Sequence, residues 1–128
     1  MKILVAEDDY ASRSAIVNFL NQFGECDATV DGNEAMAAFE MAVEEGEGYD
    51  LVCLDAQMPF KSGIEVYEHI RRLEKENGVS VDKCAKVIMT TALNQHMSDD
   101  KKLSGALYCT KPINYDVLRS MLEKAGLV

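Results

Sequence analysis

The stretch that decides the fold is LVCLDAQMP, residues 51–59. Its first four residues, Leu51–Leu54, are apolar without alternation, which is typical of a strand covered by helices on both faces. An acid, Asp55, follows directly, and Pro59 closes the segment. A buried strand that carries a carboxyl group at its end predicts an α/β sheet with polar chemistry along one edge.

Outward from this strand, short apolar runs alternate with longer segments of helical period. This alternation predicts an α/β domain with a mostly parallel sheet. Five strands are expected, over Lys2–Ala6, Glu25–Val30, Leu51–Leu54, Lys86–Thr90 and Leu107–Thr110. No internal repeat or linker divides the chain, and its 128 residues suit one domain, so residues 1–128 are predicted to form a single domain.

Four of the helices expected between the strands have clear start signals. The first covers Tyr10–Phe23, and the second begins after Asp31, a good N-cap residue. The third opens with the capping-box pattern Ser62–Glu65 and continues to Asn77–Gly78. The last starts near Asn114, where an apolar stripe of helical period begins.

The overall charge narrows the classes of partner. The net charge is −9 and the isoelectric point is near 4.6, whereas nucleic acids and anionic membranes reward a basic surface. We therefore expect protein partners, no direct DNA binding and no membrane insertion. The four cysteines have no metal-binding spacing, and we interpret them as reduced core thiols of a cytoplasmic protein. These are Cys26, Cys53, Cys84 and Cys109.

Polar side chains follow four of the predicted strands. They are Glu7, Asp8 and Asp9 after the first strand, Asp55 after the third, Thr91 after the fourth and Lys111 after the fifth. Each has an ordinary explanation on its own, such as Asp9 capping a helix or Lys111 being a solvated surface charge. Together at one edge, however, carboxylates within about 4 Å repel by about 4 kcal/mol at an effective dielectric of about 20. A bound cation would offset this repulsion.

Phosphoryl transfer gives every member of this set a role. Mg²⁺ prefers oxygen ligands and is held by one or two carboxylates with water and a phosphate oxygen. An aspartate such as Asp55 can act as nucleophile and form an acyl phosphate. Asp8 would help to hold the metal, and Lys111 would neutralise charge on the phosphoryl group. The hydroxyl of Thr91 would donate to one of its oxygens.

The same residues resemble the receiver domains of two-component response regulators, especially single-domain chemotaxis-type ones. The resemblance covers the whole chain and rests on Glu7–Asp8, the DxxMP pattern of Asp55–Pro59, Thr91–Ala92 and Lys111–Pro112. It implies a three-layer, doubly wound (βα)5 fold of the flavodoxin-like class, with a parallel five-stranded sheet in the order 2-1-3-4-5.

The resemblance also implies a site. Asp55 would accept a phosphoryl group from a histidine of a sensor kinase or a phosphotransfer protein. Asp8, Asp55 and the backbone carbonyl of Gln57 would ligate Mg²⁺, and Glu7 would act through a bound water. Lys111 would pair with the phosphoryl group, next to a Lys111–Pro112 bond that proline allows to be cis.

Signalling would follow from a switch pair, because the resemblance implies that Thr91 moves to the phosphate and Tyr108 follows. A protein partner would then read the surface of Asn94–Leu103, the strand Leu107–Thr110 and the last helix. Asn94–Leu103 is polar and lacks an apolar stripe, so we expect its helix to be short or mobile. Leu107 stands where the family has a small residue, and the segment before it is short.

Two further expectations concern single stretches. Leu93 and Gln57 occupy positions that tune phosphate lifetime in the family, and we hypothesise that Leu93 hinders the attacking water. The charged stretch Arg71–Glu76 has two interpretations, a second contact site or a solvated helix face, and the solvated face is favoured.

Two alternative functions remain at this point. An aspartyl-phosphate phosphatase would carry a second acid two residues after its nucleophile, where this chain has Gln57. A pseudo-receiver, which is an interaction module that takes no phosphate, would not need the full set of side chains present here. The sequence therefore favours a signalling switch with self-catalysed phosphotransfer and autodephosphorylation over an enzyme.

Overall fold

A computed structural model describes residues 1–92 and 105–128 of the chain. Five parallel strands form one sheet in the order β2-β1-β3-β4-β5, as predicted. This is the flavodoxin-like α/β arrangement, in which the strand order reverses next to β1. The strands are β1 (Lys2–Ala6), β2 (Glu25–Thr29), β3 (Leu51–Asp55), β4 (Lys86–Ala92) and β5 (Ala106–Lys111).

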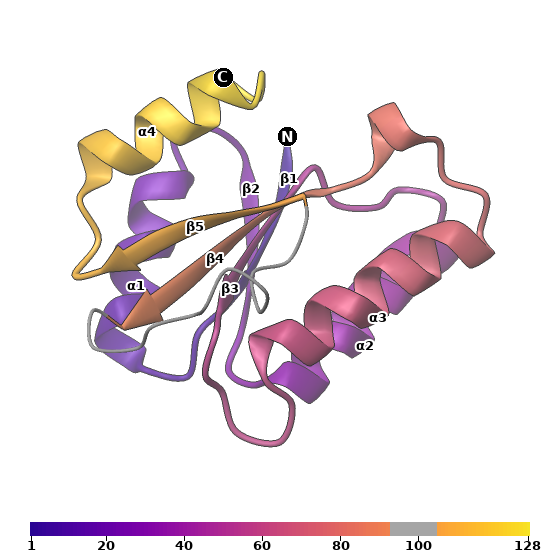
Figure 1. Cartoon of the computed structure of the whole chain (residues 1–128), viewed down its shortest axis with the longest axis horizontal. Helices are drawn as coiled ribbons and strands as arrows, with labels where there is room; N and C mark the ends of the chain where they lie inside the picture. Colours follow the sequence, from indigo (N-terminus) through magenta and orange to yellow (C-terminus); the bar gives the residue numbers. More distant parts are fainter. Residues whose placement is uncertain (93–104) are drawn as a thin grey trace.

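Helices cover both faces of the sheet and give the molecule three layers (Figure 1). On one face, α2 and α3 lie side by side, and on the other lie α1 and α4. A single turn of 3-10 helix, η1, precedes β4. The bounds are α1 (Tyr10–Leu20), α2 (Gly32–Glu44), α3 (Gly63–Glu76), η1 (Val81–Lys83) and α4 (Tyr115–Lys124).

The core is split by the sheet into two apolar clusters. Phe39 of α2 and Ile70 of α3 pack on one face, and Ile16 of α1 and Leu118 of α4 pack on the other. All five residues of β3 are buried, because side chains of alternating direction meet helices on both sides. Burial of an aliphatic side chain of this size contributes about 1.5–3 kcal/mol. The apolar run of residues 51–54 is therefore the centre of the fold.

The predicted helix starts are confirmed. The Asp31 carboxylate accepts a hydrogen bond from the Glu34 N–H at 2.8 Å. Ser62 Oγ accepts one from the Glu65 N–H at 3.2 Å, at the start of α3. At the start of α4 the Asn114 side chain accepts from the Val117 N–H at 3.2 Å. These caps satisfy N–H groups that have no partner within their own helix.

The end of the first helix was predicted wrongly. The helix α1 ends at Leu20, three residues before the predicted end at Phe23, and residues 21–23 form a turn. The chain must reverse here because the Glu25 N–H donates to the Met1 carbonyl at 2.9 Å and so begins β2 beside β1. This long-range pairing overrides the helical pattern of the segment.

Several strand ends also differ from the prediction. Asp55, Thr91 and Lys111 lie inside β3, β4 and β5 rather than after them. The ladder continues because each end has a partner on the next strand: Asp55 pairs with Thr90, and Ala92 pairs with Lys111. The second strand, in contrast, ends at Thr29, one residue earlier than predicted.

The interpretation of Arg71–Glu76 as a solvated helix face is confirmed for Arg72, Lys75 and Glu76, which are exposed, but it is wrong for Glu74, which is only 3% exposed. Its carboxylate turns inward and binds the chain at the start of β4, so this part of α3 is not a solvated face throughout. The predicted helix over Asn94–Leu103 and the role given to Leu93 lie outside the described residues.

The four cysteines are free thiols, but Cys26 and Cys84 are only half-buried, so the prediction of core thiols holds for two of the four. Cys53 and Cys109 are buried in the sheet, and burial raises the pKa of both thiols, to about 12 for Cys53. These two are therefore core residues and not reactive thiols. In the described part of the chain, no helix has the length and apolar character that crossing a bilayer requires.

Candidate functional site

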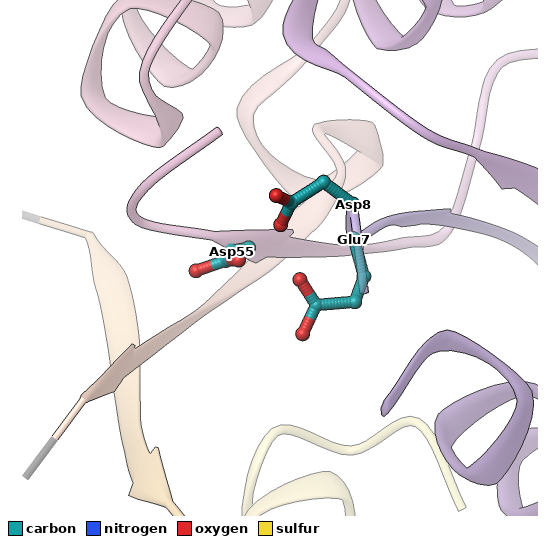
Figure 2. Close-up of side chains that lie close together, drawn as sticks. All are labelled: Glu7, Asp8 and Asp55. Atoms are coloured by element: carbon teal, nitrogen blue, oxygen red, sulfur yellow. The ribbon is translucent and has the colours of Figure 1, made fainter. Parts of the chain in front are cut away.

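Three carboxyl groups meet at the carboxyl end of the sheet. Glu7 and Asp8 follow β1, and Asp55 ends the adjacent strand β3. One carboxylate oxygen from each lies within 4.8 Å of the other two. Figure 2 shows the three side chains close together, with those of Glu7 and Asp8 extending toward Asp55. The sequence prediction that the acids gather at one edge is confirmed.

Among the residues that the structure describes, one lysine reaches this cluster, from β5 on the far side of β4. Lys111, the last residue of β5, donates a hydrogen bond to Glu7 Oε1 at 2.6 Å. Its Nζ also lies 3.2 Å from Asp55 Oδ2. The Lys111–Pro112 peptide bond is cis. Within the described ranges, one ammonium group thus faces three carboxyl groups and does not balance their charge.

Glu7 is the most deeply buried member of the cluster, at 1% exposed. Its Oε2 atom is buried and has no hydrogen-bond partner among the residues that the structure describes. Burial raises the pKa of Glu7 to about 7, the Asp55 carboxylate adds to the rise, and Lys111 opposes it. Burial pulls the pKa of Lys111 down, but Glu7 and Asp55 outweigh this effect and leave it raised.

The backbone around Asp55 holds its side chain in place. The Gln57 N–H donates to Asp55 Oδ1 at 3.1 Å, and the Ala56 N–H donates to the Thr90 carbonyl at 2.8 Å. Gly63 lies directly behind, where a Cβ atom would be 2.5 Å from the Asp55 carbonyl oxygen. Only glycine permits this approach, so α3 starts against the end of β3. Asp55 itself is 7% exposed.

Thr91 and Tyr108 lie on neighbouring strands, β4 and β5. Thr91 is 9% exposed and follows Thr90, the register partner of Asp55. Since side chains alternate along a strand, Thr91 shares the face of Met89, where the half-buried Tyr108 packs. The two residues predicted to form a switch pair therefore lie on the same face of the sheet.

Arg13 was missed by the sequence analysis. Its Nη1 donates to the backbone carbonyls of Glu7 at 2.9 Å and Asp8 at 3.4 Å, which fixes the loop that carries both acids. The only sequence signal was a basic residue in the first turn of a helix that follows an acidic loop. Asp9, by contrast, caps α1 by accepting from the Ser12 N–H at 2.9 Å.

The cluster fits a hard divalent cation. All of its donors are oxygens, the ligand type that Mg²⁺ prefers. The buried Glu7 Oε2 without a partner is the kind of group that a bound ion, or a water of its coordination shell, would satisfy. An added positive charge would also relieve the repulsion among three carboxylates that one lysine faces.

Comparison with known proteins agrees with this geometry. The response regulator protein TrrA of Thermotoga maritima, crystallised with Mg²⁺ and BeF, is 33% identical with a TM-score of 0.76, and the match covers 99% of this chain and 98% of TrrA. The receiver domain of Saccharomyces cerevisiae Ssk1, crystallised with the histidine phosphotransfer protein Ypd1, is 28% identical with a TM-score of 0.79, covering 97% of this chain and 87% of that one.

A curated relative shows the same likeness over part of its length. The transcriptional regulatory protein CiaR of Streptococcus pneumoniae is 30% identical over 98% of this chain, and the chain spans 53% of CiaR. The family model of the response regulator receiver domain matches residues 3–123. The sheet order and the group of acids and lysine at the sheet edge agree with this match. The chain belongs to the response regulator receiver domain family.

Proposed function

We propose that residues 1–128 form one receiver domain that accepts a phosphoryl group on Asp55 and signals to a protein partner. The donor would be a histidine of a sensor kinase or of a phosphotransfer protein. One observation carries the proposal: Asp55 lies in a cluster of three carboxyl groups, and the ammonium of Lys111 is 3.2 Å from its side chain.

The metal we propose is Mg²⁺. Asp8, Asp55 and the backbone carbonyl of Gln57 would hold it, with Glu7 acting through a bound water. The bound ion would offset negative charge on the carboxylates and on the phosphoryl oxygens. Because a nearby cation favours the ionised form of an acid, its binding would lower the raised pKa of Glu7.

In the transfer step, a carboxylate oxygen of Asp55 attacks the phosphorus of the phosphohistidine. The new O–P bond forms an acyl phosphate while the N–P bond breaks, and the electron pair returns to the imidazole nitrogen. Lys111 would leave Glu7 and Asp55 to pair with the phosphoryl oxygens, which adds charge stabilisation in the transition state. The Lys111 Nζ atom already lies 2.6 Å from Glu7 Oε1 and 3.2 Å from Asp55 Oδ2. A small motion of the Lys111 side chain would therefore bring its ammonium group to a phosphoryl group on Asp55.

The signal would leave through a change in the surface near β5. A phosphoryl group adds close to two negative charges and three acceptors, and it biases the state in which Thr91 donates to it. Tyr108 would follow Thr91 on the same face and alter the surface formed by β5 and α4. Leu107 of the edge strand β5, 39% exposed, lies next to Tyr108 and is available to a partner.

The partner and the compartment are proposed on the chemistry of the surface. With a net charge of −9, the chain suits protein contacts better than direct contact with DNA. The cytoplasm suits a chain whose four cysteines are all free, because thiols stay reduced there. We propose no catalysis on an external substrate, only self-catalysed phosphotransfer and autodephosphorylation.

The test is incubation with acetyl phosphate and Mg²⁺, followed by intact-mass measurement. The wild type should gain the mass of one phosphoryl group, and Asp55→Asn should gain none. Asp9→Asn is the matched control, because asparagine keeps the helix cap and the variant should be phosphorylated like the wild type. No gain in the wild type would favour the pseudo-receiver alternative, and an equal gain in Asp55→Asn would move the phosphoryl group elsewhere.

A further inference from the structure

The loop after β3 contains a strained residue with a large exposed side chain. Phe60 has a φ of +70°, and it is the only non-glycine residue with a positive φ among those described. The Lys61 N–H donates to the Pro59 carbonyl at 2.9 Å, so Phe60 is the centre of a three-residue turn. Turns of this hand are rare, and a bulky residue pays a conformational cost there. Yet the ring of Phe60 is 77% exposed.

Both ends of the loop are held by close backbone approaches. At Gly63 a Cβ atom would lie 2.5 Å from the Asp55 carbonyl oxygen, and at Gly32 one would lie 2.4 Å from the Lys61 carbonyl oxygen. The loop is thus fixed against β3 on one side and against the start of α2 on the other. Between these two contacts, the backbone directs the Phe60 side chain into solvent.

A second exposed aromatic residue is the first residue of α1, directly after the loop that follows the neighbouring strand β1. Tyr10 is 74% exposed, and the Arg13 guanidinium lies over its ring at 5.5 Å. Arg13 is itself held by the carbonyl of Glu7, so this ring is also oriented by the loop that carries the acids. The chain has four Phe and five Tyr residues, all of them described, and only Tyr10 and Phe60 are exposed.

We propose that Tyr10 and Phe60 are the anchor residues with which this chain recognises a protein phosphodonor. The inference rests on the proposed function. Asp55 is 7% exposed and ends β3 beside β1, so the imidazole of a donor has to approach the edge of the sheet from which the loops after β1 and β3 start. The donor surface around that histidine then covers both rings. Rigid aromatic side chains that become buried are the usual centres of binding energy in an interface.

The partner that fits is a histidine phosphotransfer protein with an apolar patch beside its phosphorylated histidine. The Ssk1 receiver domain, which resembles this chain at a TM-score of 0.79, was crystallised with such a protein, Ypd1. An apolar patch would complement the two rings, while the acidic cluster would receive the phosphoryl group with its metal. A small donor needs neither ring, because it can diffuse to Asp55 unaided.

The test compares a protein donor with a small donor. Phosphorylated Ypd1 and phosphoramidate are each mixed with the wild type, Phe60→Gly, Tyr10→Ala and the control Met41→Ala, which removes a 60% exposed side chain from α2. Phe60→Gly is chosen because glycine adopts this φ without cost. We expect each of the two anchor variants to lower the rate of transfer from Ypd1 about tenfold, since each anchor is worth about one such factor.

Each other outcome decides between the two proposals. Phosphoramidate should phosphorylate all four proteins at rates within about twofold of one another, because the reaction chemistry is intact. Equal losses of rate with both donors would overturn the inference, because the rings would then act through the shape of the site and not through contact with the protein donor. No loss of rate with Ypd1 would also overturn it. So would a wild type that accepts from phosphoramidate but not from Ypd1. A wild type that accepts from neither donor would overturn the proposed function itself.

Discussion

Two buried glutamates, Glu7 and Glu74, lie in different parts of the molecule and differ in how many of their carboxylate oxygens have hydrogen-bond partners. Both are almost fully buried, at 1% and 3% exposed, and both pair with a cation. Glu74 lies on α3 and faces the start of β4, whereas Glu7 lies at the opposite end of the sheet, after β1. The two acids therefore offer a comparison at nearly equal burial.

Every oxygen of Glu74 has a partner. Arg71 Nη1 donates to its Oε1 at 2.7 Å, and the Ala85 N–H donates to its Oε2 at 2.7 Å. Arg71 also donates to the Ala85 carbonyl at 3.0 Å, so Arg71, Glu74 and Ala85 form a ring of three hydrogen bonds. Glu7 has one oxygen on Lys111, and the other is buried without a partner in the described residues. We call the Glu74–Arg71 pair closed, because both carboxylate oxygens have hydrogen-bond partners, and the Glu7–Lys111 pair open, because one oxygen has none in the described residues. A closed buried pair stabilises the fold, whereas an open pair can still bind a ligand.

The largest effect on stability should come from opening the closed pair. Glu74→Ala leaves the Arg71 guanidinium and the Ala85 N–H without their acceptor, so we expect the free energy of unfolding to fall by about 3 kcal/mol. Urea denaturation measures the change. Glu76→Ala, at an exposed position on the same helix, is the matched control and should change stability by less than about 0.5 kcal/mol. Similar effects of the two variants would contradict the structural role of Glu74.

The open pair of Glu7 and Lys111 should make the stability of the metal-free protein depend on pH. The pKa of Glu7 is about 7 in the fold against 4.5 as its ordinary value. Between these values the folded state holds a proton that the unfolded state lacks. The free energy of unfolding therefore falls as pH rises from about 4.5 to 7, by an amount on the order of 2–3 kcal/mol from this group.

Glu7→Gln should remove this slope, because the amide keeps the shape of the acid but does not titrate. We expect the metal-free variant to be more stable than the wild type at about pH 8 and similar to it at about pH 4, below the ordinary pKa of the acid. Urea denaturation at the two pH values, with a chelator present, measures the difference. Parallel pH profiles for the two proteins would mean that Glu7 is not the unsatisfied group.

A smaller effect is expected from adding metal. Millimolar Mg²⁺ should stabilise the wild type by about 1–2 kcal/mol at neutral pH, since a ligand that binds only the folded state adds RT ln(1 + [L]/Kd). Asp8→Asn should lose most of this gain, and Asp9→Asn should keep it. Thermal unfolding with and without Mg²⁺ provides the measurement. Equal gains for the two variants would place the ion outside the cluster.

Much of the site could be predicted from the sequence, because parallel strands bring their carboxyl ends to one edge. Asp55, Glu7, Asp8 and Lys111 could be gathered on that rule alone. The rule gives no distances, however, and so it could not predict that Lys111 binds Glu7 at 2.6 Å while the other Glu7 oxygen lacks a partner.

Features that depend on long-range contacts were missed or misread. Glu74 was assigned to a solvated helix face because it lies among charged neighbours, but the Ala85 N–H, eleven residues later, accounts for its burial. The positive φ of Phe60 was not predicted; its loop is approached by Gly32, which lies far away along the chain, and Gly63 at its end lies against Asp55. In each case, the deciding partner lies outside the local pattern from which the prediction was made.

The most direct test of the account locates the phosphoryl group itself. The wild type is treated with acetyl phosphate and Mg²⁺ and then reduced with borohydride, which converts an aspartyl phosphate to homoserine, and its peptides are sequenced by mass spectrometry. We predict homoserine at position 55 alone, and only when Mg²⁺ is present. Homoserine at position 8 or 9, or none at position 55, would contradict the account.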